Sequence, residues 1–423
     1  MVDRVRAKTD SAVIQFDHVT EDWTGYNLTH DSAGATQIPN GTVMEARYKL
    51  ITNVYKTTDT ENVVLKKCSS VLNYTMYGQW NSKTINTQQK IEIGNFLTSA
   101  RLEHGLPPSL ERQDTLCGNV TFPTDVIPNL KWFRALCDPE GEHPCCVNNQ
   151  CSSRTVTECQ CETCFDMRQP LHAEYSEWLP REEGCRIKYF NQKEACDLLN
   201  GVSLFLVGDS LIRHLYTALV MLLRNNLKDG AISDNAPTDA KRRCSGMYIF
   251  SDRRCRVYVD DDIEHICNGH NFSLKFFEYY STHYSVNITQ LARKNLNKPK
   301  TILLVGVGLH DNLNFRRIQL NLLQPLLNIL KYQRWPKFVW ATPHSAGILK
   351  TDSIKAQSRS SMVSFIREIE EFLKVHNIPV FNTFNLTKNV MSFDGTHYGL
   401  GINLLKSQIL LNYIKELRDS GSL

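Results

Sequence analysis

A nearly unbroken apolar run over residues 202–207 stops at Gly208-Asp209-Ser210, and a helical pattern follows to about residue 224. Apolar residues lie on almost every side of that helix, which predicts a helix buried against a sheet. Ser210 then falls at the carboxyl end of a strand and the amino end of a helix. Open α/β sheets bind ligands there, and free N–H groups favour negative charge. Taken alone, Ser210 would be read as a helix cap.

The same alternation of apolar runs and helical patterns continues to the carboxyl terminus, which predicts a mostly parallel sheet with helices on both faces. Further strands are predicted at 301–308, 338–342 and 378–381, and further helices at 316–332, 353–375 and 400–417. A long insertion after the first helix holds two more candidate strands, 255–261 and 274–280. We predict three regions: a polar β or extended region (1–110), a cysteine-rich subdomain (111–200) and the α/β domain (201–423).

Cysteines and glycosylation sequons both favour the secretory pathway. The chain has 14 cysteines, an even number that a cytosolic protein rarely carries except for metal or redox work. Seven Asn-x-Ser/Thr sequons are candidate glycosylation sites: Asn27, Asn40, Asn73, Asn119, Asn271, Asn287 and Asn385. No apolar segment follows Met1 and no run is long enough to span a membrane, so neither a signal peptide nor an anchor is visible. We expect either a truncated gene model or a luminal portion of a longer chain, secreted or in the lumen of the ER or Golgi; a cytosolic protein is the alternative.

Two groups of residues could instead bind metal. Cys161 and Cys164 have the spacing of zinc ligands, and Cys267 lies near His265 and His270 beside Asp260–Asp262. The first group lacks a matching Cys-x-x-Cys or His pair and the sequons imply an oxidising lumen, so disulfides are favoured there, with a connectivity that the sequence leaves open. At the second group, a disulfide at Cys267 and solvated acidic residues are the simpler explanation. Cys244, Cys255 and Cys267 are expected to staple the insertion.

Charge and loop patterns exclude two other classes of ligand. Lysine and arginine number 48 against 44 acidic residues, and the basic residues are scattered apart from 241–243 and 253–254. This is too weak a basic footprint for a nucleic-acid partner. Gly306-Val307-Gly308 could begin a dinucleotide loop, but Asp311 occupies the place of the third glycine.

A serine nucleophile needs a base, and the base needs an acceptor that orients it. Asp394 and His397 lie three residues apart in a turn-rich stretch before the last helix. A folded loop can bring the carboxylate to one ring nitrogen of His397 and leave the other for Ser210. Asp-x-x-His alone is a weak pattern, but together with the strand-end Gly-Asp-Ser it predicts a Ser-Asp-His triad.

Val207-Gly208-Asp209-Ser210 with Arg213, and Asp394-Gly395-Thr396-His397, resemble the two signature blocks of the PC-esterase family. That family is a branch of the SGNH/GDSL hydrolase superfamily and includes trichome-birefringence-like proteins, the sialate O-acetyltransferase luminal domain, and neurexophilin-and-PC-esterase proteins. The resemblance covers roughly Cys185 to the end. It implies an SGNH-like, flavodoxin-like three-layer sandwich.

The resemblance also implies roles for individual residues. Ser210 would be the acyl nucleophile, His397 the general base and Asp394 its orienting acceptor, with Asp209 shaping the turn. Gly308, His310 and, most weakly, Gly246 would complete the oxyanion hole; His310 stands where the wider superfamily has asparagine. Arg213 would pair with a carboxylate or face the site.

The activity so implied is hydrolysis or transfer of an O-acyl group, most often acetyl, on a glycan. It needs no cofactor other than an acetyl donor if the enzyme is a transferase, and the expected partner is an O-acetylated glycan or another acyl ester. Two alternatives remain open at this point: a catalytically silent, secreted binding or adhesion module on the same fold, and a lipid esterase, which would need a large apolar pocket near Ser210.

Overall fold

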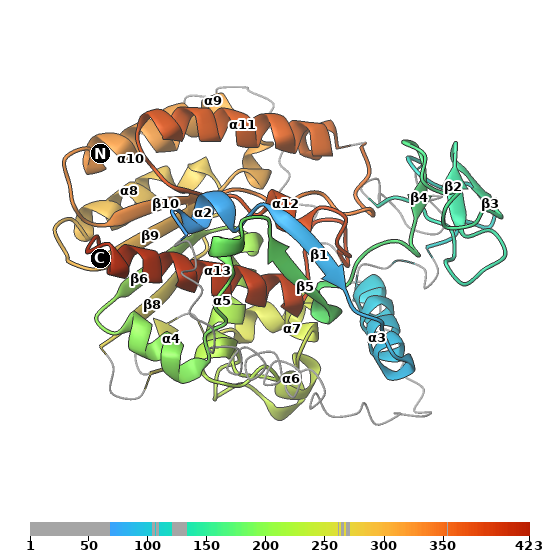
Figure 1. Ribbon diagram of the computed structural model, residues 1–423, viewed down its shortest axis with the longest axis horizontal. Coiled ribbons are helices and arrows are strands. Elements are labelled where there is room, and N and C mark those ends of the chain that lie inside the picture. Colours follow the sequence, from blue (N-terminus) through green and yellow to red (C-terminus); the bar gives the residue numbers. More distant parts are fainter. Residues whose placement is uncertain are drawn as a thin grey trace, which may run out of the picture. The chain divides into compact units, whose positions relative to one another are not determined.

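Six strands form one sheet in which β6 and β9 lie side by side near the centre (Figure 1). The computed structural model describes residues 68–103, 106, 110–120, 133–260, 262–263, 266–267, 271–352 and 354–423. In spatial order the strands are β11 (Val380–Phe381), β10 (Lys337–Ala341), β9 (Thr301–Gly306), β6 (Ser203–Gly208), β8 (Ser273–Phe277) and β7 (Asp262–Ile263). All neighbouring pairs are parallel except β7 with β8.

Helices cover both faces of this sheet, so the predicted three-layer α/β class is confirmed (Figure 1). One face packs against α4 (Gln192–Leu199), α5 (Ser210–Leu223) and α13 (Leu400–Asp419). The other packs against α8 (Ser285–Lys294), α9 (Phe315–Ile318), the π-helical η7 (Gln319–Leu323), α10 (Gln324–Leu330) and α11 (Arg359–Val375).

Side chains of the central strands alternate between the two layers. Leu204 and Leu206 of β6 pack with α5 and α13, whereas Val207 joins the core beneath α8, α10 and α11. Ile302 and Leu304 of β9 likewise face one layer, and Leu303 and Val305 the other. Because both faces are buried, these strands read in the sequence as continuous apolar runs rather than as alternating ones.

The strand order places the end of β6 at a topological switch point. Taken in chain order, the parallel strands lie as 2-1-3-4-5, with β8 on one side of β6 and β9 on the other. The connections from β6 and β9 therefore leave in opposite directions, which opens a crevice at the carboxyl ends of these two strands. Ser210 follows β6 and Gly308 follows β9, so both lie at this crevice.

The described part of the region before residue 110, mainly 68–103, differs from the prediction, and residues 1–67 lie outside the described residues. Instead of extended chain, it contains α2 (Val71–Tyr74), β1 (Gly78–Ser82) and the 17-residue helix α3 (Thr87–Glu103). Strand β1 pairs antiparallel with β5 (Ser176–Pro180), and Cys68 is joined to Cys185. Phe96 of α3 packs in the same core as α5 and α13. The polar composition hid this helix because most of its residues are partly exposed and its apolar periodicity is weak.

The region predicted as a cysteine-rich subdomain, 111–200, contains a three-stranded sheet closed by disulfides, while its later elements β5 and α4 pack with the rest of the chain. It contains β2 (Cys145–Val147), β3 (Gln150–Ser152) and β4 (Phe165–Asp166). Four bonds join its cysteines: Cys117–Cys146, Cys137–Cys151, Cys145–Cys159 and Cys161–Cys164. The zinc interpretation of Cys161 and Cys164 is therefore wrong. No break in packing marks residues 110 or 200, since all described residues belong to one compact unit.

The described part of the insertion between α5 and β8 consists of short helices joined by turns, followed by the edge strand β7. It contains α6 (Thr238–Arg243), α7 (Tyr248–Ser251) and the 3₁₀ segment η4 (Arg253–Tyr258), so the strand predicted at 255–261 is wrong. Cys244–Cys255 closes a loop within it, and Cys196–Cys267 ties it to α4. Cys267 is thus a disulfide partner, while His265, His270 and Asp261 lie outside the described residues.

The remaining short elements are loops with one helical turn. They are η2 (Ala173–Tyr175), η3 (Glu183–Cys185), η5 (Thr282–Tyr284), η6 (Leu309–Asp311), η8 (Lys355–Gln357) and α12 (Phe384–Thr387).

Candidate active site

Ser210 is the first residue of α5, not its cap. The N-cap is Asp209, whose carboxylate accepts the backbone N–H of Leu211 at 2.9 Å. Gly208 makes this abrupt strand-to-helix turn possible, because a side chain there would collide with the carbonyl of Gly306 on β9 and with Ile212. Ser210 is left half-buried at the helix terminus, accessible to a ligand. Asp209 shapes the turn, as predicted.

The turn Asp394-Gly395-Thr396-His397 folds around one carboxylate. Oδ1 of Asp394 accepts the backbone N–H groups of Thr396 at 2.8 Å and His397 at 2.6 Å. Oδ2 lies 2.6 Å from Nδ1 of His397. An Asx-type turn of this kind explains why the three-residue spacing suffices to bring carboxylate and imidazole together.

Ser210, Asp394 and His397 form one hydrogen-bonded chain. Oγ of Ser210 lies 2.7 Å from Nε2 of His397, although 187 positions separate the two residues. Because a carboxylate can only accept, Nδ1 of His397 carries the proton that faces Asp394, and Nε2 is left to accept from the serine hydroxyl. Asp394 is 3 % exposed and the His397 side chain 24 %. The acceptor is therefore buried while the imidazole reaches the surface.

A loop from the end of β10 braces this turn. Gly347 donates its N–H to the carbonyl of Gly395, and Nζ of Lys350 donates to Oγ1 of Thr396 at 3.0 Å. On its other side, Leu349 accepts the N–H of Arg134, which precedes β2. Burial lowers the pKa of Lys350, and Asp394 opposes this effect. The disulfide-closed region thus supports the loop on which the Asp-His turn rests.

The oxyanion candidates separate into two groups. Gly308 and His310 follow β9 at the crevice. Burial raises the pKa of the Asp209 carboxyl, and His310 is near enough to Asp209 to oppose that rise. The His310 ring also packs on Tyr280 at 4.8 Å between centroids. Gly246 does not join them: its N–H donates to the carbonyl of Lys228 inside the insertion, so it is committed elsewhere.

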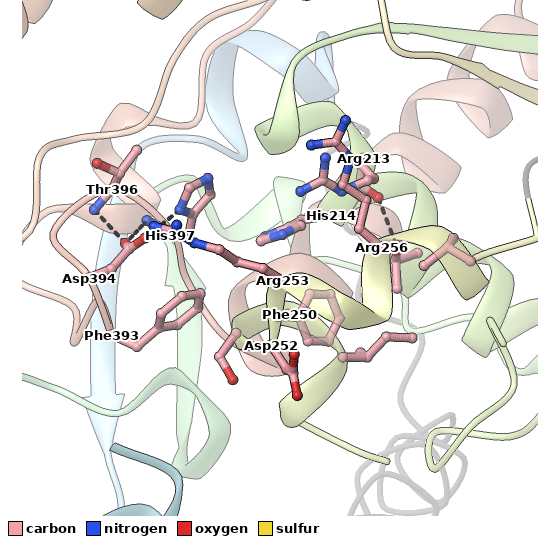
Figure 2. A pocket seen from close by; sticks show the side chains of 14 residues that line it. Arg213, His214, Phe250, Asp252, Arg253, Arg256, Phe393, Asp394, Thr396 and His397 are labelled. Carbon is pink, nitrogen blue, oxygen red and sulfur yellow. Dashed lines mark hydrogen bonds and ion pairs between the residues drawn. The ribbon is translucent and has the colours of Figure 1, made fainter. Parts of the chain in front are cut away.

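A pocket of about 140 Å³ opens beside the triad (Figure 2). Asp394, Thr396 and His397 form one wall, and the insertion and α5 form the other. Arg213 satisfies both predicted possibilities, because it lines the pocket and its Nη1 lies 2.7 Å from Oε1 of Glu278. Arg253 and Arg256 also line the pocket and were not among the site residues predicted from the sequence, where the basic pair at 253–254 was their only signal.

Two further histidines lie behind the triad without touching Ser210. The His214 ring packs on Phe250 and lies 5.1 Å from the His397 ring, and burial lowers its pKa well below the usual range. His344 is buried against Thr383 and Lys406 rather than lining the pocket. Burial likewise lowers the pKa of His344 well below the usual range. His214 lines the pocket as well as packing on Phe250.

Among the described residues, the clusters with metal-ligand composition are two sets of three cysteines, all of them joined in disulfides. None of these clusters lies in the pocket lining. The pocket lining combines the imidazole of His397, three arginines and apolar side chains with the carboxylates of Asp252 and Asp394, both of which are engaged by neighbouring cationic or N–H groups. Ser210 is not among the lining residues and reaches the pocket through His397.

The sequons fall on several elements. Asn73, Asn119, Asn271 and Asn287 are exposed, whereas Asn385 of α12 is half-buried. Asn27 and Asn40 lie outside the described residues. In the part of the chain that is described, we find no helix with the length and apolarity to cross a membrane.

Comparison with known proteins returns one structural match worth reporting. No protein-family model matches the chain, and no curated protein matches it by sequence. Among solved structures, it is similar to a member of the lipolytic protein G-D-S-L family from Veillonella parvula DSM 2008. That match has 12 % identity and a TM-score of 0.32, and it covers 51 % of this chain and all of the other. The function of this chain must therefore be argued from Ser210, Asp394 and His397 themselves.

Proposed function

We propose that this protein is a serine-dependent enzyme that cleaves or transfers O-acyl groups, acetyl above all, on glycans. The observation that carries the proposal is the hydrogen-bonded chain from Ser210 Oγ through His397 to Asp394 at the edge of a pocket. A nucleophile, a base and an orienting acceptor in this order are the components of acyl transfer through a covalent intermediate.

The reaction begins when Ser210 Oγ attacks the ester carbonyl and its proton passes to His397 Nε2. Asp394 stabilises the imidazolium that forms, and because it is buried and hydrogen-bonded it holds the ring in place. The tetrahedral intermediate collapses, His397 returns the proton to the leaving sugar oxygen, and an acyl-serine remains. Water or a second sugar hydroxyl, deprotonated by His397, then attacks the acyl-serine and releases the acid or the new ester.

The negative oxygen of the intermediate needs donors at the switch point. The backbone N–H of Ser210, at the first position of α5, lies where the helix dipole is positive. Gly308 N–H and the His310 ring are our candidates for the second and third donors. Each such donor contributes roughly 3 kcal/mol to lowering the barrier.

The pocket favours a short acyl group on a polar carrier. It is small and carries three arginines, which does not suit the long apolar chain of a lipid. With water as acceptor the protein is an esterase; with a sugar hydroxyl it is an acetyltransferase that takes the acetyl group from a separate donor and needs no other cofactor. On this proposal the chain is an SGNH-type hydrolase whose motifs resemble those of the PC-esterase branch.

Seven disulfides and no free cysteine among the described residues support an oxidising compartment. We propose that the protein works outside the cell or in the lumen of the secretory pathway, and that its sequons carry glycans.

Two measurements test the proposal. A fluorophosphonate probe is expected to label the wild type and not Ser210→Ala, with Ser360→Ala, an exposed serine of α11, as a labelled control. Acetate release from O-acetylated polysaccharides should disappear in His397→Ala. Folded wild-type protein that neither reacts with the probe nor releases acetate would instead identify a silent binding module on this fold.

A further inference from the structure

The insertion presents two arginines to the pocket from one face. Arg253 and Arg256 lie three residues apart in η4, which is one 3₁₀ turn, so both start from the side of η4 that lines the pocket. Their side chains then diverge, Arg253 towards His397 and Arg256 towards Arg213 (Figure 2). Cys255, between them, is buried and bonded to Cys244. The disulfide therefore holds this segment so that its arginines face the pocket.

Neighbouring charges divide into a structural group and a pocket group. Asp252 caps η4 and is neutralised by Arg254 at 2.8 Å and Arg243 at 3.3 Å, neither of which lines the pocket. Arg213 and Arg256 both reach Glu278, at 2.7 Å and 3.3 Å. Two guanidinium groups thus share one carboxylate, which leaves an excess of positive charge on that wall.

The two arginines that share Glu278 differ in exposure. Arg213 is 16 % exposed, and burial followed by repulsion from Arg256 lowers its pKa despite the attraction of Glu278. Arg256 is 58 % exposed and can turn towards a ligand. A second anion bound between them would relieve the repulsion, and guanidinium groups suit carboxylate and sulfate because they bind both in a bidentate way.

Figure 2 shows how this charge is distributed around the triad. Arg253 extends across the pocket towards His397, while Arg213 and Arg256 lie together on the far side of His214. Apolar side chains, among them Phe250 and Phe393, line the pocket between them. Arg213 is shielded from solvent, whereas Arg253 and Arg256 are exposed at the pocket mouth. Positive charge gathered around a partly apolar pocket attracts an anion into it.

We propose that this pocket binds an acidic substituent, a carboxylate or a sulfate, on the glycan whose ester reacts with Ser210. The inference rests on the proposed function and specifies its substrate class as acidic glycans. Arg256 and Arg213 hold the anion on one side of His214, and Arg253 steers the same sugar towards the triad. An uncharged glycan lacks these contacts and binds without a fixed orientation.

The test compares one O-acetylated uronic-acid oligosaccharide as the free acid and as its methyl ester. For the wild type, kcat/KM on the free acid should exceed that on the methyl ester by about 10-fold or more. In Arg253→Gln/Arg256→Gln it should fall roughly 10- to 100-fold on the free acid, as expected for lost charge-assisted contacts, and stay within about 2-fold on the methyl ester. Arg242→Gln, an exposed arginine of α6 outside the pocket, is the matched control.

A sulfated oligosaccharide without acetyl groups, added as inhibitor, distinguishes the two anions: stronger inhibition than by the unacetylated uronate assigns the pocket to sulfate. Two results would overturn the proposal. One is a wild-type kcat/KM that is the same on the free acid and on the methyl ester. The other is a double variant whose kcat/KM falls equally on both substrates while its melting temperature is unchanged. Hydrolysis of p-nitrophenyl acetate is followed in parallel. If this activity and probe labelling are both absent, the proposed function has failed, and calorimetric titration with the unacetylated uronate still tests the arginines alone.

Discussion

Nζ of Lys406 lies 3.3 Å from Nε2 of His344, and both side chains are buried beneath the first turn of α5. Lys406 also donates to the carbonyl of Leu211, the residue after the proposed nucleophile, and to Oδ1 of Asn403. Burial lowers the pKa of Lys406 to about 7, with Asp209 acting in the opposite direction. A lysine next to the serine turn therefore changes its protonation near neutral pH.

This lysine makes the free energy of unfolding depend on pH. Between the folded pKa of about 7 and the unfolded value near 10.5, the unfolded state binds more protons, so this group makes stability rise with pH. The cost of the buried charge is complete below about pH 7 and vanishes above pH 10.5. We expect Lys406→Met to gain stability relative to wild type, by roughly 2 kcal/mol more at pH 7 than at pH 9.

Urea unfolding at the two pH values measures this difference. Lys415→Met, which removes a surface lysine from the same helix, is the control for the loss of a lysine side chain. A stability difference between Lys406→Met and wild type that is the same at pH 7 and pH 9 would show that Lys406 stays charged when folded.

Asp394→Asn should lower kcat by about 10³- to 10⁴-fold while changing substrate binding little. The amide would present a donor to Nδ1 of His397, which favours the tautomer that can no longer accept the Ser210 proton. Steady-state acetate release and the rate of probe labelling measure the loss. Asp252→Asn is the control, since Asp252 lines the pocket but is held by Arg243 and Arg254; a similar loss there would point to general electrostatics instead.

Gly395→Ala should disable the site and destabilise the fold. Gly395 has φ of 83°, and a Cβ there would come 2.6 Å from the backbone nitrogen of Lys350. The turn must open, so we expect a loss of about 1–3 kcal/mol of stability together with most of the activity. Thermal melting and acetate release report the two effects. Gly94→Ala, in the middle of α3 with no atom near its Cβ, should instead be neutral or slightly stabilising.

Removing the Cys244–Cys255 bond should affect both stability and the acidic-glycan pocket. Cys244→Ser/Cys255→Ser removes a bond between residues 11 positions apart. The unfolded chain then gains conformational entropy, which lowers the free energy of unfolding by about 3 kcal/mol. Because η4 loses its anchor, KM for an acidic substrate should rise more than KM for p-nitrophenyl acetate. The matched variant Cys161→Ser/Cys164→Ser removes a bond across three residues and should leave both KM values unchanged; equal effects from the two variants would exclude an anchoring role.

Glycan occupancy is expected to follow exposure. Asn73, Asn271 and Asn287 are exposed and should be modified when the protein is expressed in a secretory pathway. Asn385 is half-buried, and the hydroxyl of its sequon residue Thr387 contacts Thr383, Phe384 and Ser345. Peptide mass spectrometry after enzymatic deglycosylation should therefore find site 385 least occupied. Equal occupancy at all four sites would contradict this.

Local patterns were informative wherever burial on both sides imposed an apolar run. The strands at β6, β9 and β10 and the helices α5, α11 and α13 were all recognised within a few residues, because the hydrophobic core that specifies them is written into consecutive side chains. Helix α3 and segment η4 were misread because their residues are mostly polar or partly exposed, so their structure depends on what they pack against. Among the proposed site residues, Arg253 and Arg256 were missed for the same reason.

The amino-acid sequence alone determined the α/β layering, the turn after β6 and the local Asp-x-x-His geometry, since each depends on neighbours within a few positions. Only the tertiary structure decided that Ser210 meets His397, that Gly246 is committed to Lys228, and that three arginines share the pocket. These facts depend on contacts between segments that are distant in the sequence. The strand order establishes the first of them, and the Cys244–Cys255 bond holds the segment that carries Arg253 and Arg256. No periodicity in a single sequence encodes such contacts.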